Sequence, residues 1–223
     1  MDHRRLDYDG DGLTEDQLLE TPFAQARLWV DEALARAERS PDVVEPLAMS
    51  VATVDRQGHP NVRTVLMRFL DERGPGFVTA LTSTKGREIL LNPAVAAALT
   101  WPAMYRAIRF RGRALPLDDA EVEEYFDSRP WASRISAWTS RQSEPIGSRK
   151  ELEAAYARRA EQFPEGRARV PVPDFWGGFR IVPDELEFWA GRRNRLHDRL
   201  VFTRTGEGHL GDPTSWRLHR RQP

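Results

Sequence analysis

The sequence contains no cysteine among its 223 residues. This absence excludes disulfide bonds, thiolate nucleophiles, and zinc or iron–sulfur centres with cysteine ligands. The five histidines show no paired metal-ligand spacing, so we expect no metal site. The glycine-rich phosphate loops of P-loop and dinucleotide-binding proteins are also missing.

An excess of charge of one sign is absent as well. The chain has 33 basic and 34 acidic residues, a formal net charge of −1. General nucleic-acid binders usually carry a basic excess, so we expect no nucleic-acid partner. No apolar run approaches the ~20 residues of a membrane span, and the opening MDHRRLDYDGDG lacks the hydrophobic region of a signal peptide. We therefore expect a cytoplasmic protein with no membrane partner.

The N-terminal residues are polar, and we predict a mobile arm over residues 1–21 followed by a single domain over residues 22–223. Asp7–Gly12 looks like the start of a calcium loop, but Leu18 stands where that loop needs a bidentate glutamate. A solvated acidic arm is the better interpretation. No internal repeat or low-complexity linker divides the remaining chain.

Hydrophobic periodicity predicts the elements of that domain. Thr21 and Pro22 predict the start of a helix, because proline suits the first helical turn. We expect helices over residues 23–37, 82–92, 117–126 and 149–162, and strands over residues 48–54, 62–69, 76–81, 95–101, 107–114, 186–189 and 196–204. Many short strands with a few helices predict an α+β, mainly β fold around a small antiparallel barrel.

Three cationic residues, Arg195, His197 and Arg199, alternate with Leu196 and Asp198. On a strand they would share one face, since side chains switch faces at every residue. Guanidinium groups grip phosphate through parallel hydrogen bonds, so the pattern favours an anion site. It also fits an exposed strand whose arginines pair with carboxylates, and the local pattern leaves both interpretations open.

Two other segments carry cations in positions that suit an anion. The segment Arg63–Arg68 has an arginine at each end, and Ser83–Lys85 lies at a predicted helix start. Free backbone N–H groups and the helix dipole attract anions there. Together with the Arg195–Arg199 segment, the chain offers two separate sets of phosphate-binding cations. This pattern suits two phosphorylated small molecules, or one molecule with two phosphates.

Seven segments stand out along the chain: Arg5–Tyr8, Arg63–Leu66, Tyr125–Pro130, Arg141–Ser143, Phe175–Gly178, Glu187–Trp189 and Arg195–Arg199. In this order they resemble the pyridoxamine 5′-phosphate oxidase family of flavoenzymes, and the resemblance covers nearly the whole chain. It implies an FMN-binding split β-barrel, antiparallel and Greek-key-like, with peripheral helices. It also implies a homodimer with FMN bound at the subunit interface.

The resemblance further implies a role for individual residues. Lys85 would hold the FMN phosphate, and the full set of FMN contacts would be Arg63, Thr64, Val65, Leu66, Arg68, Val78, Thr79, Ser83, Thr84, Lys85, Ala107, Gln142, Ser143, Trp189 and Arg199. Substrate contacts would be Arg5, Tyr8, Arg68, Tyr125, Arg129, Ser133, Arg195 and His197. Arg195 and His197 would be catalytic, over the reacting carbon, and His197 could accept a proton near neutral pH. Arg5 and Tyr8 would lie in a segment that closes on the substrate.

Four of these positions depart from the usual family residue. The family usually has a lysine where this chain has Arg68, and a tyrosine where it has Val78. It usually has an arginine on the FMN phosphate in place of Thr84, and a flavin-contacting glutamine in place of Ala107. Losing a hydrogen bond to a charged group costs about 1.5–3 kcal/mol. We therefore expect weaker FMN binding or a different redox tuning.

By resemblance, the protein oxidises pyridoxamine 5′-phosphate or pyridoxine 5′-phosphate to pyridoxal 5′-phosphate in vitamin B6 metabolism. Two electrons leave the C4′ carbon, and molecular oxygen is reduced to hydrogen peroxide. One alternative is a related phenazine-type FMN oxidase of secondary metabolism; another is a non-catalytic flavin or pyridoxal-phosphate binding protein. Tyr125, Arg129 and Ser133 favour a phosphorylated substrate, whereas Arg68 and Ala107 keep the non-catalytic alternative open.

Overall fold

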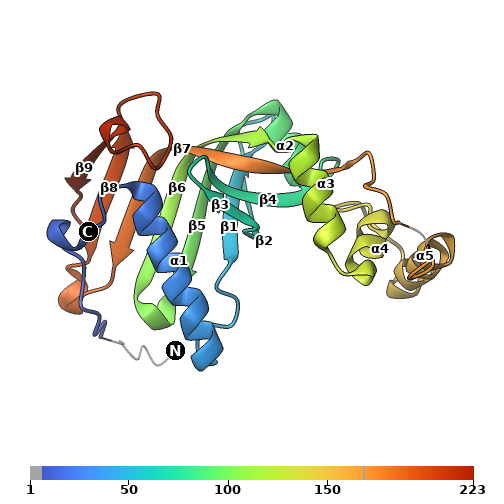
Figure 1. Ribbon diagram of the computed structural model, residues 1–223, viewed down its shortest axis with the longest axis horizontal. Coiled ribbons are helices and arrows are strands. Elements are labelled where there is room, and N and C mark those ends of the chain that lie inside the picture. Colours follow the sequence, from blue (N-terminus) through green and yellow to red (C-terminus); the bar gives the residue numbers. More distant parts are fainter. Residues whose placement is uncertain (1–6, 168) are drawn as a thin grey trace.

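The computed structural model describes residues 7–167 and 169–223. In these residues nine strands form one sheet, in the order β2-β1-β5-β6-β7-β4-β3, and β8 and β9 continue from β7 (Figure 1). The strands are β1 (Ala48–Val54), β2 (Pro60–Leu66), β3 (Phe69–Asp71), β4 (Gly74–Ala80), β5 (Ala94–Trp101), β6 (Arg106–Pro116), β7 (Trp176–Ala190), β8 (Asp198–Arg204) and β9 (Trp216–Arg220). The α-helices are α1 (Pro22–Arg39), α2 (Thr84–Leu91), α3 (Asp119–Ser128), α4 (Trp131–Thr139) and α5 (Arg149–Gln162).

The long strand β7 determines how this sheet curls. One of its edges pairs with β6 from Phe179 to Ala190. Its other edge pairs first with β4, over residues 176–180, and then with β8, over residues 185–190. Where these two partners part, the side chain of Arg204 donates hydrogen bonds of 2.9 and 3.0 Å to the carbonyl of Pro183. The sheet thus splits into two branches and forms a curled antiparallel half-barrel, which confirms the predicted α+β, mainly β split-barrel fold.

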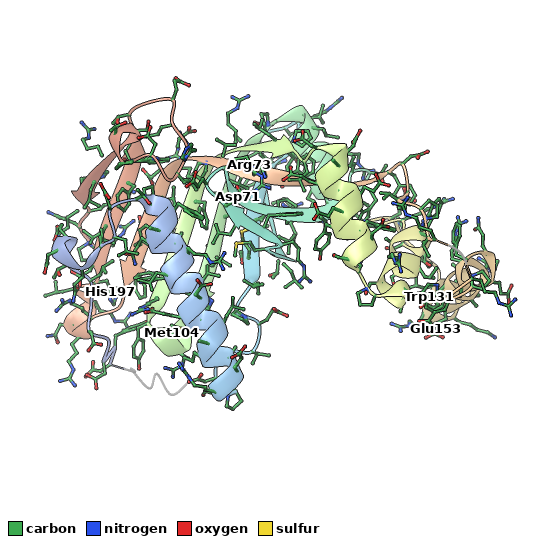
Figure 2. All side chains as sticks on the ribbon, viewed as in Figure 1. Asp71, Arg73, Met104, Trp131, Glu153 and His197 are labelled. Atoms are coloured by element: carbon green, nitrogen blue, oxygen red, sulfur yellow. The ribbon has the colours of Figure 1, made fainter. Side chains whose placement is uncertain are left out.

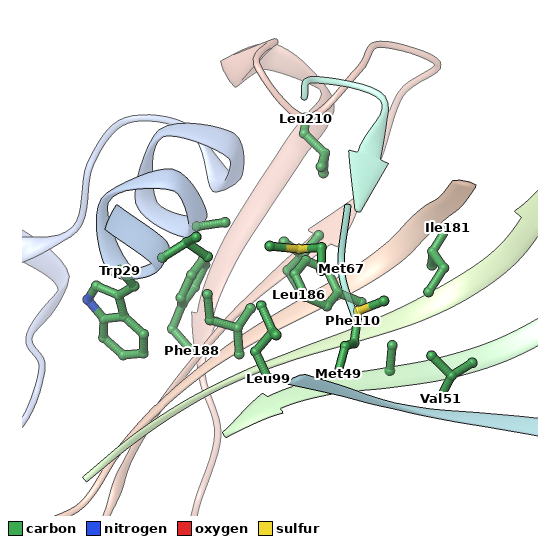
Figure 3. Close-up of a cluster of buried hydrophobic side chains, with 14 of the residues drawn as sticks. Trp29, Met49, Val51, Met67, Leu99, Phe110, Ile181, Leu186, Phe188 and Leu210 are labelled. Carbon is green, nitrogen blue, oxygen red and sulfur yellow. The ribbon is translucent and has the colours of Figure 1, made fainter. Parts of the chain in front are cut away.

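The main hydrophobic core lies between α1 and the curled sheet (Figure 3). The helix begins as predicted, because the Thr21 hydroxyl accepts a hydrogen bond of 3.1 Å from the backbone N–H of Ala24. Trp29 is 2% exposed and packs edge-to-face on Phe188, with ring centroids 5.4 Å apart. This contact attaches α1 to the half of β7 that pairs with β8.

A smaller core supports the helices at the other end of the sheet. Its buried residues come from α3, α4, β7 and the segments beside them: Leu117, Val122, Phe126, Ile135, Val170 and Trp176. Figure 1 shows α3, α4 and α5 at one end of the molecule and β8 and β9 at the opposite end. The two ends therefore have separate cores, joined by the strands between them.

The helix α4 was not predicted from the sequence. Its nine residues include serine and threonine, which compete with the backbone for hydrogen bonds and favour helices weakly. The detectable signal was the spacing of Trp131, Ile135 and Trp138, four and then three residues apart. Of these, Ile135 is fully buried in the smaller core.

The predicted strand over residues 62–69 is interrupted at Met67 and Arg68. Strand β2 ends at Leu66 and β3 begins at Phe69. Between them the backbone N–H of Met67 donates to the carbonyl of Leu47 at 2.9 Å, and that of Arg68 donates to Gly76 at 2.8 Å. The chain changes its hydrogen-bond partners across these two residues, from the segment before β1 to β4.

The predicted strand over residues 196–204 is wrong at its start, and so is the shared face that followed from it. The last pair between β7 and β8 is Ala190 with Asp198, so β8 begins at Asp198. Asn194 and Arg195 have φ angles of 59° and 63° in the short turn before it. Arg195 and His197 therefore lie in the β7–β8 connection, and of the three cationic residues Arg199 alone belongs to the strand.

The Trp29–Phe188 contact generates a stability prediction. Replacing Trp29 with alanine removes a buried aromatic side chain, and should lower the free energy of unfolding by about 3–5 kcal/mol. Denaturant unfolding at fixed protein concentration measures this loss. Leu28→Ala is the matched control on the same helix, because Leu28 is 38% exposed and should cost about 0.5 kcal/mol or less. Similar losses for the two variants would contradict this assignment of the core.

Candidate functional site

A first pocket, here the Lys85 pocket, lies where β2 and β4 meet α2, α3 and α4. Its volume is about 520 Å³, and it is lined by Thr64, Val65, Leu66, Arg68, Val78, Thr79, Lys85, Tyr125, Ser128, Arg129, Pro130, Ser133 and Gln142. It brings together eight predicted FMN contacts with the predicted substrate contacts Tyr125, Arg129 and Ser133. Ser128 and Pro130 were not predicted, although both are direct sequence neighbours of Arg129.

The ammonium group of Lys85 is buried and has only neutral hydrogen-bond partners. It donates to Gln142 Oε1 at 2.8 Å and to Thr79 Oγ1 at 3.1 Å. Burial, and then the positive charge of Arg63, lower the pKa of Lys85 to about 8. Within the described part of the chain no carboxylate lies in salt-bridge contact with this ammonium. An anion entering the pocket would supply the missing negative charge.

The predicted FMN contacts around Lys85 are held by local hydrogen bonds. The Ser83 hydroxyl caps α2 by accepting from the backbone N–H of Gly86 at 3.2 Å. The N–H of Thr84 donates to the Ser143 hydroxyl at 3.2 Å. These bonds tie the start of α2 to the segment that carries Gln142, so the capping residue and Ser143 orient the residues of the pocket.

Arg63, in contrast to Lys85, already has an anionic partner. Its guanidinium lies 3.0 Å from the Glu88 carboxylate and donates to Thr53 Oγ1 at 2.6 Å and to the carbonyl of Val51 at 3.1 Å. Its charge is therefore compensated within β1, β2 and α2. Lys85 is the less compensated of the two cations at this end of the pocket.

Arg129 is the second cation that lacks an anion in this pocket. Its guanidinium lies 5.1 Å from the ring centroid of Trp176 and 5.7 Å from that of Phe126, both in the smaller core. Its Nη1 is buried and has no hydrogen-bond partner in the described residues. Desolvation lowers the pKa of this guanidinium, Tyr125 opposes that effect, and Arg68 adds to it. A buried donor without an acceptor is costly unless a ligand provides one.

A second pocket, here the Trp189 pocket, lies on the branch of the sheet that carries β8. It measures about 430 Å³ and is lined by Thr100, Ala107, Arg109, Glu187, Trp189, His197, Arg199 and Pro223. Strand pairing brings three of these residues together, because Trp189 on β7 pairs with Ala107 on β6 and with Arg199 on β8. Ala107, Trp189, His197 and Arg199 were predicted. Glu187 was missed, although its position two residues before Trp189 places both side chains on one face of the strand.

Glu187 neutralises Arg199 at the floor of this pocket. Its side chain is 2% exposed and accepts hydrogen bonds from Arg199 Nη2 at 2.7 Å and Nε at 3.1 Å. Arg109 and Arg221 also lie within 3.3 and 3.5 Å of the same carboxylate. For Arg199, the interpretation that the arginines pair with carboxylates is therefore correct.

The imidazole of His197 is held as a hydrogen-bond donor. Its Nδ1 accepts a hydrogen bond of 3.0 Å from the backbone N–H of Arg192. In a neutral imidazole the proton then lies on Nε2. Burial, and then the positive charge of Arg195, lower the pKa of His197 below its ordinary value. Both effects favour the uncharged ring, in which Nε2–H is available as a donor.

The described part of the predicted arm lies against His197. The ring of Tyr8 makes edge contacts with His197 at 5.0 Å, Tyr105 at 5.3 Å and Trp189 at 6.0 Å between centroids. The exposed guanidinium of Arg195 lies 5.8 Å from the same ring. The structure thus brings Tyr8 together with Arg195 and His197, two other predicted substrate contacts. Arg5 lies outside the described residues, and the mobility of the arm stays a prediction.

The two pockets have no lining residue in common. Figure 2 shows His197 and Trp131, the first residue of α4, near opposite ends of the long axis. One chain therefore assembles the predicted phosphate contacts in one place and the predicted catalytic residues in another. Among the residues that the structure describes, no group of three or more histidine, aspartate or glutamate side chains could hold a metal ion. Within these residues, none of the helices has the length and hydropathy that a bilayer span requires.

Comparison with known proteins relates both pockets to one family. Residues 36–163 match the family described as pyridoxamine 5′-phosphate oxidase, and residues 176–223 match the pyridoxine 5′-phosphate oxidase C-terminal dimerisation region. A pyridoxine/pyridoxamine 5′-phosphate oxidase of Crocosphaera subtropica is 42% identical over 98% of this chain and 97% of its own length. The protein of the same name from Rubrobacter xylanophilus is 44% identical over 98% of this chain and 94% of its own length.

Two solved structures are similar in fold. PhzG from Burkholderia lata, solved with tetrahydrophenazine-1-carboxylic acid, is 29% identical and has a TM-score of 0.82. The match covers 96% of this chain and 99% of the PhzG chain. An FMN-binding protein from Nostoc punctiforme, related to pyridoxamine 5′-phosphate oxidase, is 18% identical with a TM-score of 0.68. That match covers 88% of this chain and 96% of the Nostoc chain. The comparisons support FMN as the cofactor, and the dimerisation region supports a homodimer. The chain belongs to the pyridoxamine 5′-phosphate oxidase family.

Proposed function

We propose that the protein oxidises pyridoxamine 5′-phosphate or pyridoxine 5′-phosphate to pyridoxal 5′-phosphate, with FMN as cofactor and molecular oxygen as electron acceptor. The observation that carries this proposal is the buried Nη1 of Arg129, which has no acceptor in the described residues. It lies in one pocket with the hydroxyl groups of Tyr125 and Ser133. A guanidinium and two hydroxyls suit the oxygens of a phosphate monoester.

The residues present also fit FMN. Lys85, a buried cation with neutral partners, would hold its phosphate, with Arg63 and the capped start of α2 beside it. Trp189 and Arg199 of the second pocket would bind the ring system. When bound, FMN supplies the two-electron acceptor that amino-acid side chains lack.

A homodimer would complete the site. One chain holds the Lys85 pocket and the Trp189 pocket apart, yet the proposed reaction needs the cations of the first and the catalytic residues of the second on one substrate. The residues Trp189, His197 and Arg199 all belong to the matched dimerisation region. We therefore propose that the Trp189 pocket of one subunit faces the Lys85 pocket of the other, with FMN at the interface.

Within such a site, this chain's residues bind and orient the substrate. Arg129, Tyr125 and Ser133 anchor the phosphate, while Arg195 and the Nε2–H of His197 orient the reacting end. For the amine, pyridoxamine 5′-phosphate, oxygen and water give pyridoxal 5′-phosphate, ammonia and hydrogen peroxide. A cytoplasmic location stays a prediction.

The test is an oxygen-coupled assay of the purified protein loaded with FMN. With pyridoxamine 5′-phosphate we expect the aldehyde and peroxide to form in equal amounts. Turnover only of a ring without phosphate would support the phenazine-type alternative, which the similarity to PhzG keeps in view. Binding of FMN and substrate without turnover would support a non-catalytic binding protein.

A substitution at Arg129 tests the substrate pocket. Arg129→Ala should raise KM for pyridoxamine 5′-phosphate about 10- to 100-fold, because a hydrogen-bonded charge pair is lost. The Kd for FMN, measured by flavin fluorescence, should change little. The matched control is Arg149→Ala, since the Arg149 side chain is 81% exposed on α5. Equal losses of substrate and FMN affinity in Arg129→Ala would show that the pocket is wrongly assigned.

The lowered pKa of Lys85 predicts how FMN binding depends on pH. The FMN phosphate favours the protonated amine, which the free protein loses as pH rises through about 8. FMN affinity should therefore be full below that pH and fall above it, by at most about tenfold per pH unit. Flavin fluorescence titrations from about pH 7 upward, where the phosphate is already a dianion, measure this.

Two lysine variants are the controls for the pH titration. Lys85→Met should bind FMN weakly at every pH and lack the step near pH 8. Lys150→Met, on the exposed first turn of α5, should retain the step. A step that persists in Lys85→Met would mean that another group titrates.

A further inference from the structure

Asp198, the first residue of β8, connects three separate segments through one buried carboxylate. Asp198 is 8% exposed. Oδ2 accepts from the backbone N–H of Leu13 at 2.9 Å and from Nε of Arg192, and Oδ1 accepts from Nη1 of Arg220 on β9 at 2.5 Å. These donors belong to the N-terminal segment, the β7–β8 connection and β9.

The N-terminal segment is fixed firmly at Leu13. Its N–H is bound by Asp198, its carbonyl accepts from Arg220 Nη2 at 3.2 Å, and its side chain is 6% exposed in the main core. Arg220 also holds Glu15 through two hydrogen bonds of 2.9 and 2.7 Å. The chain is therefore attached to β8 and β9 at residues 13–15.

This attachment determines where Tyr8 can lie. Five residues of extended chain reach about 17 Å at most, so Tyr8 stays near the β7–β8 connection. Among the described residues, this segment also makes the ion pair between Asp9 and Arg193, whose side chains are 71% and 67% exposed. Exposed pairs contribute about 0–1 kcal/mol. The buried attachment at Leu13 is thus the stronger constraint on Tyr8.

The same carboxylate also restrains His197. The side chain of Arg192 binds Asp198, while the backbone N–H of Arg192 donates to His197 Nδ1. A shift of Arg192 would therefore release the bond that holds the imidazole proton on Nε2. Both routes end at the group formed by Tyr8, His197 and Trp189.

We infer that Asp198 is a positioning residue, which holds Tyr8 and His197 in the geometry that the substrate requires. It acts through Leu13 and Arg220 on the N-terminal segment, and through Arg192 on the imidazole. This inference deepens the proposed function and rests on it. Asp198 is not itself among the residues that line either pocket, although its sequence neighbours His197 and Arg199 line the Trp189 pocket.

The first test is independent of any substrate. Asp198→Asn keeps the shape of the side chain but removes the charge that binds two arginines. Amide hydrogen exchange of residues 8–13 should become about tenfold faster or more, because the segment opens locally. Exchange within β8 and β9 should stay unchanged. Arg220→Gln, which retains the Asp198–Arg192 pair, is the second variant should Asp198→Asn fold poorly.

The matched control breaks a different ion pair of the same sheet. Glu185→Gln removes the partner of Arg221, 2.9 Å away, and should leave exchange at residues 8–13 unchanged. Faster exchange in the control too, or equal loss of protection throughout β8 and β9, would mean that Asp198 serves only general stability. Either result would overturn the inference.

The second test measures coupling to Tyr8 and His197. In the FMN-loaded protein, Asp198→Asn should lower kcat/KM for pyridoxamine 5′-phosphate about 10- to 100-fold, as displacement of orienting groups does, with the Kd for FMN unchanged. The Kd for pyridoxal 5′-phosphate is then compared in two backgrounds, the wild type and the double variant Tyr8→Ala/His197→Asn. Asp198→Asn should raise this Kd far less in the double variant than in the wild type. Equal effects in both backgrounds would refute positioning. If the wild type is inactive, the proposed function is refuted. The hydrogen-exchange experiment then still tests whether Asp198 holds residues 8–13.

Discussion

The continuous pairing of β7 is the constraint on which the rest of the structure depends. Its first residues pair with β4 behind the Lys85 pocket, and its last residues carry Glu187 and Trp189. From Gly178 to Trp189 a strand extends by about 35 Å. Because β6 pairs along most of this length, β7 cannot fold back and bring the two pockets together. A single chain thus keeps the Lys85 pocket and the Trp189 pocket apart, and the second subunit of the proposed site follows from the length of one strand.

The charged residues of the site fall into two groups that only the structure distinguishes. Arg63 and Arg199 are compensated by the buried carboxylates of Glu88 and Glu187. Lys85 and Arg129 have neutral or aromatic neighbours and remain electrostatically incomplete. Compensated cations can be held rigidly without a ligand, whereas incomplete ones gain most from binding an anion.

This division also shows how far the sequence could predict the site. Local signals were sufficient for the helix starts at Thr21 and Ser83, because a capping hydroxyl acts within a few residues. Motifs in order were sufficient for the family and for most residues that line the Lys85 pocket, but for only four of the eight that line the Trp189 pocket. The partners of Arg199 and Asp198 could not be read from the sequence, since they depend on strand register and on contacts between distant segments. The alternation of Arg195, His197 and Arg199 misled for the same reason, because the ladder ends at Asp198.

The two-residue crossover at Met67 and Arg68 has a consequence for how such proteins diverge. Its backbone is held by main-chain hydrogen bonds to Leu47 and Gly76, which do not depend on the side chain at either position. Met67 fills the core, but Arg68 projects into the Lys85 pocket from an already fixed backbone. Evolution can therefore exchange the residue at position 68 without refolding the strands around it. The lining of the Lys85 pocket can change there while the fold stays constant.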